Sequence, residues 1–246
     1  MTRLTRIALF SVAAAALAVP GSASLAQASK PTVAIMYFNN NVFTKDARDF
    51  DGLSKGVPDF LITEMSANSG IRVIERDQVQ KLLDEQKLVS SGQVDQATAV
   101  KVGKLLGAQH MIFGGFMADP NGNFRIDARA VNVETGAIEY TERVQDKADN
   151  VLALIGTLAT RLNAGLKLPP SPMRTGDAGA PGGARQAGSP TAAKLPMRYA
   201  VMYGKALDLA DKGDKAHAVE LFGAVLKEFP DYAPARSGMA KVKPGS

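Results

Sequence analysis

Short apolar runs alternate with helical stripes of apolar residues along the first two thirds of the chain. Residues 32–38 form a compact apolar run that ends in asparagines, which is typical of a buried strand. Between Asp51 and Asn68 apolar residues recur at helical spacing, with Pro58 inside the stripe. A strand followed by a helix is therefore expected here.

Alternating strand and helix patterns continue to residue 168. We expect further elements in the following order: a strand over 71–75, a helix from Asp77 to Leu88 with Asp77 as its cap, a helix over 97–106 ended by Gly107, a strand over 110–117, two strands joined at Glu134-Thr135-Gly136, and a helix over 150–166. The order is β, α, β, α, α, β, β, β, α. Two strands linked through helices and three in a meander indicate an α/β (α+β) fold, with a mixed sheet of about five strands flanked by helices.

The strand register around residues 134–136 can be argued from side chains. A three-residue loop with Gly136 in the left-handed conformation pairs Asn132 with Ile138, Ala130 with Tyr140 and Ile126 with Val144. Most apolar residues then share one face, and Asp127 lies opposite Arg143. A two-residue loop would scatter the apolar residues over both faces, so the three-residue loop is favoured.

A Pro, Gly, Ala and Ser-rich stretch divides the chain. Residues 169–196 have no apolar periodicity and are expected to form a disordered linker. The expected organisation is therefore a signal peptide over 1–28, an α/β domain over 29–168, the linker, and a small helical hairpin over 197–246.

The N-terminus has the pattern of a secretory signal. Arg3 and Arg6 precede an uncharged stretch over 7–19, and small residues follow up to Ala28. The apolar run has 13 residues, whereas a membrane-spanning helix needs about twenty. We expect cleavage between Ala28 and Ser29 and a periplasmic product.

The composition excludes several kinds of functional site. The chain contains no cysteine, which excludes disulfides, thiolate metal sites and cysteine nucleophiles, and leaves no thiol for an N-terminal lipid anchor. The formal charge of +5 includes Arg3 and Arg6. Such a small excess, with acidic and basic residues interleaved, does not favour nucleic-acid binding.

The sequence predicts no catalytic residue, metal site or cofactor. His110 adjoins a strand and His217 lies on the polar side of a helix, and neither has carboxylates at metal-ligand spacing. The sequence also shows no acid and base residues placed as a catalytic pair. A binding or scaffold protein is therefore favoured over an enzyme.

Several motifs together resemble a known family. They are residues 33–35 at the first strand, 71–77 leading into a helix, 103–108 before the third strand, and 129–136 at the hairpin. These segments resemble the periplasmic domain of the curli-secretion-channel family (CsgG-type), and are similar to the amino-terminal domain of TolB and the activators of penicillin-binding proteins. The resemblance covers about 30–168 and implies a fold more than an activity.

Two features limit what the resemblance implies. The curli channel is a lipoprotein whose subunits insert long β-hairpins into the outer membrane, and this chain has no cysteine for the lipid. The connections over 117–124 and 133–138 are also too short for membrane strands, which need about nine to eleven residues each. Pore formation is therefore not expected.

Residues 199–232 resemble a single tetratricopeptide repeat, on the spacing of Ala218, Phe222 and Pro230. The resemblance implies a groove for a peptide or helix. We expect its apolar residues to serve protein association: Met202, Leu209, Leu221, Phe222, Val225 and Phe229.

The expected function is non-enzymatic. The protein would support assembly or secretion of an envelope component through contacts with envelope proteins. Two alternatives stay open: a homo-oligomeric, ring-forming subunit of a curli-like secretion apparatus, and, less favoured, an enzyme.

Overall fold

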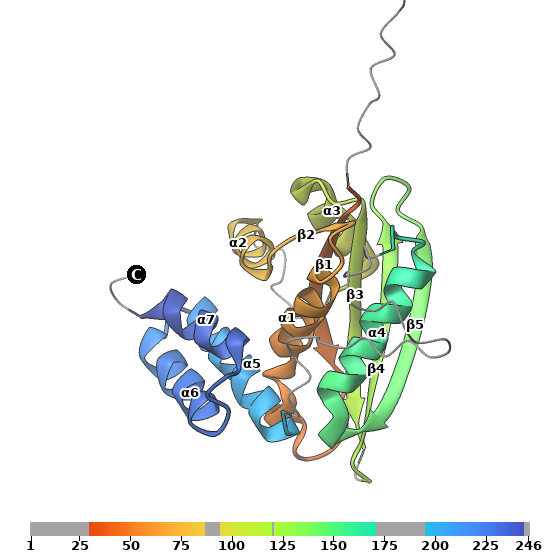
Figure 1. Ribbon diagram of the computed structural model, residues 1–246. Helices are drawn as coiled ribbons and strands as arrows, with labels where there is room; N and C mark the ends of the chain where they lie inside the picture. The colour runs from red at the N-terminus through yellow and green to blue at the C-terminus, as the bar shows by residue number, and fades with distance from the viewer. Residues whose placement is uncertain (1–29, 87–93, 120, 171–194, 244–246) are drawn as a thin grey trace, which may run out of the picture.

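The computed structural model describes residues 30–86, 94–119, 121–170 and 195–243 (Figure 1). The expected cleavage site at Ala28 and Ser29, and residues 171–194 of the expected linker, lie outside the described residues.

Strands and helices follow the predicted order as far as α4, and three helices come after it in the described residues. The elements are β1 (Thr32–Asn40), η1 (Ala47–Phe50), α1 (Leu53–Ser66), β2 (Arg72–Val73), α2 (Arg76–Gln86), α3 (Gln96–Leu106), β3 (His110–Ala118), β4 (Asn123–Asn132), β5 (Ile138–Lys147), η2 (Ala148–Asn150), α4 (Val151–Gly165), α5 (Met197–Asp211), α6 (Lys215–Glu228) and α7 (Ala233–Val242).

The described strands form one mixed, five-stranded sheet in the order β2-β1-β3-β4-β5. The pairs β2-β1 and β1-β3 are parallel, whereas β3-β4 and β4-β5 are antiparallel. The predicted fold class is therefore confirmed. Its physical basis is that parallel neighbours need helical crossovers, while consecutive antiparallel strands need only short turns.

Helices cover both faces of the sheet (Figure 1). On one face α1 and α4 bury Val33, Ile35 and the alternate apolar residues of β4. On the other face α2 and α3 pack over a smaller core that includes Met36, Met111 and Phe113. On this second face, outside the smaller core, the strands β4 and β5 expose polar side chains such as Arg129 and Arg143.

The hairpin register is confirmed along most of its length. Ile126 pairs with Val144, Asp127 with Arg143 and Ala130 with Tyr140. The pairing of Asn132 with Ile138 is wrong, because the register shifts after Ala130 and Ile138 pairs with Val131. The connection is also longer than predicted, since the Asn132 side chain accepts hydrogen bonds from the N–H groups of Glu134 and Thr135 at 3.0 Å each. Gly136 has the predicted left-handed conformation, with φ of 74°.

Asp77 does not cap α2 as predicted. The helix begins at Arg76, and Asp77 lies in its first turn with its carboxylate directed at two cations. The ionic contacts at this position outweigh the cap that the sequence pattern favours. Helix α2 ends at Gln86, and Leu88 lies outside the described residues.

The C-terminal helices pack on the α/β part of the chain (Figure 1). Helix α5 crosses α1 at two glycines, and a Cβ on Gly204 would lie 1.9 Å from the carbonyl oxygen of Gly52. Gly56 lies at the same crossing, where a Cβ added to it would be 3.5 Å from the Gly204 Cα. The two backbones therefore touch, and the buried residues of α1, α5 and α6 belong to one continuous apolar core.

Candidate functional site

A cleft of about 490 Å³ lies between the α/β part and the C-terminal helices. It is lined by residues from α1, the start of α2, and helices α5, α6 and α7. Its lining contains apolar residues such as Ile62, Leu207 and Phe222, and a group of charged residues around Arg76. We refer to this space as the α1–α7 cleft.

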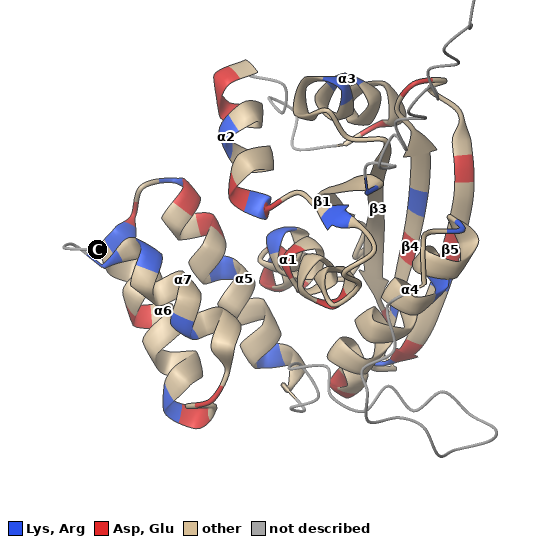
Figure 2. Ribbon diagram, turned by 45° about the horizontal axis from the view of Figure 1, so that its top comes forward, with Lys and Arg blue, Asp and Glu red and all other residues tan. Residues whose placement is uncertain are grey.

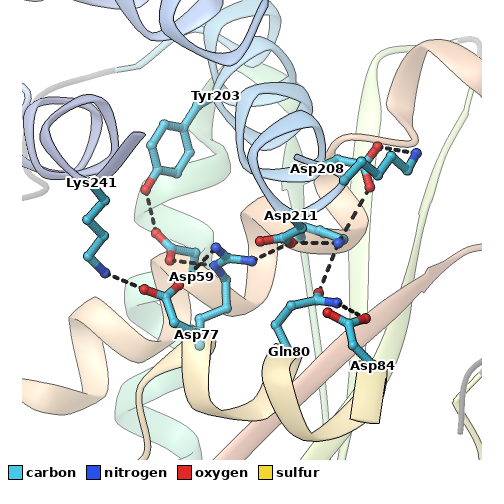
Figure 3. A network of polar contacts seen from close by, with 11 residues as sticks. Asp59, Asp77, Gln80, Asp84, Tyr203, Asp208, Asp211 and Lys241 are labelled. Atoms are coloured by element: carbon cyan, nitrogen blue, oxygen red, sulfur yellow. Dashed lines mark hydrogen bonds and ion pairs between the residues drawn. The ribbon is translucent and has the colours of Figure 1, made fainter. Parts of the chain in front are cut away.

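Arg76 is the centre of the charged group, and Figure 3 shows three of its partners, Asp59, Asp77 and Asp211. Its side chain is only 8% exposed, and its Nη1 donates to Asp211 Oδ2 at 2.7 Å. The Nη2 atom donates to Asp77 Oδ1 at 3.0 Å, and Nε lies 3.5 Å from Asp59 Oδ1. We call these four residues the Arg76 cluster. Because Asp211 belongs to α5 and the other members to α1 and α2, the cluster joins the two parts of the chain.

Tyr203 adds a second link from α5. Its hydroxyl donates to Asp59 Oδ2 at 2.6 Å, and its ring stacks on Phe60 with the centroids 5.3 Å apart. The ring also contacts Phe222 and Tyr232 at 5.8 and 5.7 Å. Tyr203 thus combines an apolar contact with α1 and a hydrogen bond to the cluster.

Two lysines extend the network, and Figure 3 shows one of them, Lys241, beside Asp77. Lys55 of α1 donates to Asp211 Oδ2 at 2.6 Å and to Gln80 at 3.0 Å, so that it connects α1 with both α2 and α5. Lys241 of α7 donates to Asp77 Oδ2 at 2.6 Å. Helices α5 and α7 are therefore both held to the α/β part by ion pairs.

Burial and charge change the titration of the cluster. Burial raises the pKa of Asp59 more than the Tyr203 hydrogen bond and the Arg76 charge lower it. For Asp77, burial is outweighed by Lys241 and Arg76, and the pKa lies below its usual value. Burial alone would lower the pKa of Arg76, but Asp211, Asp59 and Asp77 raise it overall. Arg76 consequently stays charged, and Asp59 takes up a proton more readily than an exposed aspartate.

The lining of the cleft combines paired charges with apolar residues. Each carboxylate of the cluster is engaged by a cation or a hydroxyl. Among the lining residues, Ala233 and Pro234 offer accessible apolar contacts, and the exposed Ser237 and Lys241 offer polar contacts. Within the described residues, no group of three or more His, Asp or Glu side chains is placed to hold a metal ion.

The six residues expected to serve association lie in the C-terminal helices, where Phe222 and Val225 are fully buried. Met202, Leu209, Leu221 and Phe229 are partly buried against the same core. Of the six, Phe222 lines the α1–α7 cleft. Their role in association stays a prediction.

The Arg76 cluster could not be predicted from the sequence. Arg76 belongs to the 71–77 motif, which indicates only a fold, and its main partner Asp211 lies 135 residues away. One signal was available: Gly52 and Gly56, like Ala200 and Gly204, are four residues apart on predicted helices. Paired small residues at this spacing mark a helix face that accepts close approach of another backbone.

The two histidines have ordinary partners. His110 Nδ1 contacts the carboxylate of Glu139, and His217 Nδ1 lies 2.7 Å from Asp214 Oδ2. Within the part of the chain that is described, none of the helices has both the length and the apolarity to cross a bilayer.

Comparison with known proteins supports the family resemblance. Residues 17–122 match the family model described as curli production assembly/transport component CsgG. The predicted resemblance to that family is thereby confirmed over this region. No curated protein matches the chain.

Solved structures give more distant similarities. The LpoB C-terminal domain from Escherichia coli is 12% identical, with a TM-score of 0.36, over 48% of this chain and 84% of that one. TolB from Acinetobacter baumannii is 12% identical, with a TM-score of 0.38, over 56% of this chain and 28% of that one. The PelC dodecamer from Paraburkholderia phytofirmans is 9% identical, with a TM-score of 0.34, over 56% of this chain and 88% of that one.

Proposed function

We propose that this protein is a periplasmic component of the cell envelope that supports assembly or secretion of an envelope component by binding other proteins. The observation that carries the proposal is the match of residues 17–122 to a family described as an assembly and transport component. The N-terminal pattern of Arg3, Arg6 and the apolar stretch over 7–19 supports export. No catalytic step is part of the proposed function.

The α1–α7 cleft is the proposed binding site for a segment of the partner. A peptide or short helix would place an apolar side chain against Ala233 and Pro234 of α7, which line the cleft and are accessible. Its polar groups would meet Lys241 and Ser237 at the rim. The tetratricopeptide-like pattern predicts a groove within the helical hairpin, whereas the cleft lies between those helices and α1–α2.

Site-specific photocrosslinking in cells tests this proposal. A photoreactive amino acid at Ser237, which is exposed and lines the cleft, should yield a discrete adduct with an envelope protein. The matched control is the same amino acid at Lys101, which is exposed on α3 at the other face of the sheet. Equal labelling at both positions, or none at Ser237, would contradict binding in the cleft.

The mass of the exported protein separates the scaffold from the ring-forming alternative. A scaffold is expected as a monomer or a small oligomer, whereas a ring requires a heterologous interface repeated around a closed axis. Light scattering on the purified protein therefore distinguishes the two, since a ring of many subunits would favour the assembly-subunit alternative.

A further inference from the structure

The strands β4 and β5 carry charged side chains on one face of the sheet, and Figure 2 shows both signs of charge along them. On β4 this is the face of Val131, which belongs to the smaller core with α2 and α3, because side chains two residues apart share a face. Directly opposed residues of antiparallel strands also share a face. The opposed pairs on this face are Arg129 with Thr141, Asp127 with Arg143, and Arg125 with Gln145.

Three arginines on this face form a row with a regular step. Arg143 lies opposite Asp127, halfway between Arg129 and Arg125 of the neighbouring strand. At about 3.4 Å per residue, successive arginines are therefore about 6.8 Å apart along the strand direction, on strands about 4.8 Å from each other. We call Arg125, Arg129 and Arg143 the arginine row.

The arginine row is accessible and keeps a positive charge. The side chains of Arg125 and Arg143 are 31% and 66% exposed, and Arg129 is exposed as well. Asp127 accepts from Nε of Arg125 at 2.8 Å and from Nε of Arg143 at 2.6 Å. An arginine carries four further N–H groups on its two Nη atoms, and these two contacts do not use them. Three arginines around one aspartate leave the row with a formal charge of +2.

The step of the row matches an extended acidic segment. In an extended chain every second side chain lies on the same face, about 6.8 Å from the one before it. Three Asp or Glu residues at alternate positions would therefore bring one carboxylate to each arginine, and such pairs are charge-assisted hydrogen bonds. We infer that the arginine row is a docking surface for an extended segment of another protein that carries acidic residues at three alternate positions.

This chain does not supply such a segment itself. Nowhere in its 246 residues do three acidic residues stand at alternate positions, so a second copy has no matching extended segment to offer. The residues outside the described ranges contain Asp177 as their one acidic side chain, together with several basic ones. The charge complementarity therefore points to a different protein as the occupant.

The inference goes beyond the proposed function and does not rest on it. The arginine row belongs to β4 and β5, whereas the α1–α7 cleft is lined by α1, α2 and the C-terminal helices. Photocrosslinking at Ser237 and binding at the arginine row can therefore fail separately.

Short peptides test the spacing on the full chain. The peptide Glu-Thr-Glu-Thr-Glu has carboxylates at alternate positions, and Thr-Glu-Glu-Glu-Thr has the same composition with contiguous carboxylates. Both are acetylated and amidated, so that their ends carry no charge. In an NMR titration the alternating peptide should bind with a Kd below about 1 mM, and at least about three times more tightly than the contiguous one. Equal affinities, or no binding of the alternating peptide at about 1 mM, overturn the inference.

Neutral substitutions in the row test which residues bind. Arg129→Gln and Arg143→Gln should each raise the Kd of the alternating peptide about two- to fivefold, which is the effect expected of one exposed ion pair. Lys227→Gln on α6 removes the same charge from an exposed position of the C-terminal helices and should leave the Kd unchanged. An equal effect of all three substitutions would mean that binding follows only net charge, which overturns the inference.

A charge exchange tests the position of the central pair. Arg143 is the middle of the row, so it meets the middle carboxylate in either direction of the peptide. Arg143→Glu should therefore prefer Glu-Thr-Lys-Thr-Glu, whereas the native protein should prefer the alternating acidic peptide. Trigalacturonate, a sugar chain that also has three carboxylates, is the last control. If it binds the native protein as tightly as the alternating peptide, the surface takes anionic glycans and the inference is overturned.

Discussion

At the scale of single residues, replacement of Arg76 should strongly destabilise the protein. It is nearly fully buried and serves Asp211, Asp77 and Asp59 together. Arg76→Met would leave these carboxylates without their shared cation, and breaking a buried pair in this way typically costs about 3–5 kcal/mol. Denaturant unfolding measures this free energy, and Lys101→Met on the exposed face of α3 should change it by no more than about 0.5 kcal/mol.

A double variant shows whether the loss of unfolding free energy comes from the Arg76–Asp211 pair. Arg76→Met with Asp211→Asn removes a buried cation and its closest carboxylate together, so the combined cost should be smaller than the sum of the two single costs. Strict additivity would mean that the Arg76–Asp211 pair itself does not stabilise the protein.

Asp59 should make stability depend on pH. Because burial raises its pKa above the usual value of 3.8, the folded state binds a proton that the unfolded state does not bind in the pH range just above 3.8. This contribution is fully present below 3.8 and is lost as the pH rises through the folded-state pKa. Asp59→Asn removes the contribution. The difference in unfolding free energy between the native protein and D59N should therefore shift in favour of the native protein as the pH is lowered from about 7 towards about 4, and a constant difference would contradict it.

At the scale of elements, the crossing of α1 and α5 depends on Gly204. Alanine at Gly204 would place Cβ 1.9 Å from the Gly52 carbonyl oxygen, so the helices would have to separate. In α6, alanine at Gly223 meets its nearest atom, Met239 Cε, at 3.6 Å, which is ordinary contact. Since alanine favours a helix over glycine by about 1 kcal/mol, Gly223→Ala should be neutral or stabilising, whereas Gly204→Ala should destabilise. Hydrogen exchange at α5 reports the loosening, and equal behaviour of the two variants would argue against a tight crossing.

Phe222 tests the packing among the C-terminal helices. Its ring is fully buried, contacts Tyr203 of α5, and lies against Gly238 of α7. Phe222→Ala should therefore cost about 3–5 kcal/mol, measured by chemical unfolding. Leu105→Ala, a truncation of an exposed apolar residue on α3, serves as the control.

How far the elements could be predicted depended on how local their determinants are. The hairpin register followed from neighbouring side chains, with Asp127 opposite Arg143, and Gly136 fixed the turn. Helix α3 could be predicted for the same reason, because its ends are set locally. Asp95 accepts a hydrogen bond from the Thr98 N–H at its start, and Gly107 ends it with φ of 65°. The bulge beyond Ala130 was missed, since it depends on the Asn132 side chain closing the turn. The contact of Gly204 with Gly52 could not be predicted either, because it joins helices far apart in the sequence.

At the scale of the whole molecule, the candidate site could not be predicted, because its contacts join distant parts of the chain. Asp59 and Tyr203 are 144 residues apart, and each looks like an ordinary amphipathic-helix residue in its own segment. The strand and helix pattern predicts that residues 30–168 fold on their own, and this stays a prediction. The shared core and the Arg76 cluster lead us to expect that such a fragment melts at a lower temperature than the full chain.

Export is a second property of the whole chain. The pattern ending at Ala28 predicts that the periplasmic protein begins at Ser29 or within a few residues of it. N-terminal sequencing of the protein from a periplasmic extract checks this. Recovery of the chain from the cytoplasm with Met1 in place would contradict both export and the proposed function.

The docking of α5 on α1 also distinguishes a complete chain from an interrupted one. Asp211 follows Arg76 by 135 residues, so a chain that ends before α5 contains the arginine without its main carboxylate. In such a chain the face of α1 that carries Phe60 has no cover from Tyr203. A product that stops at residue 196 would keep this face open permanently, and pulse-chase labelling should show that cells degrade it faster than the complete protein. The last helices thus give the cell a means to distinguish finished chains from interrupted ones.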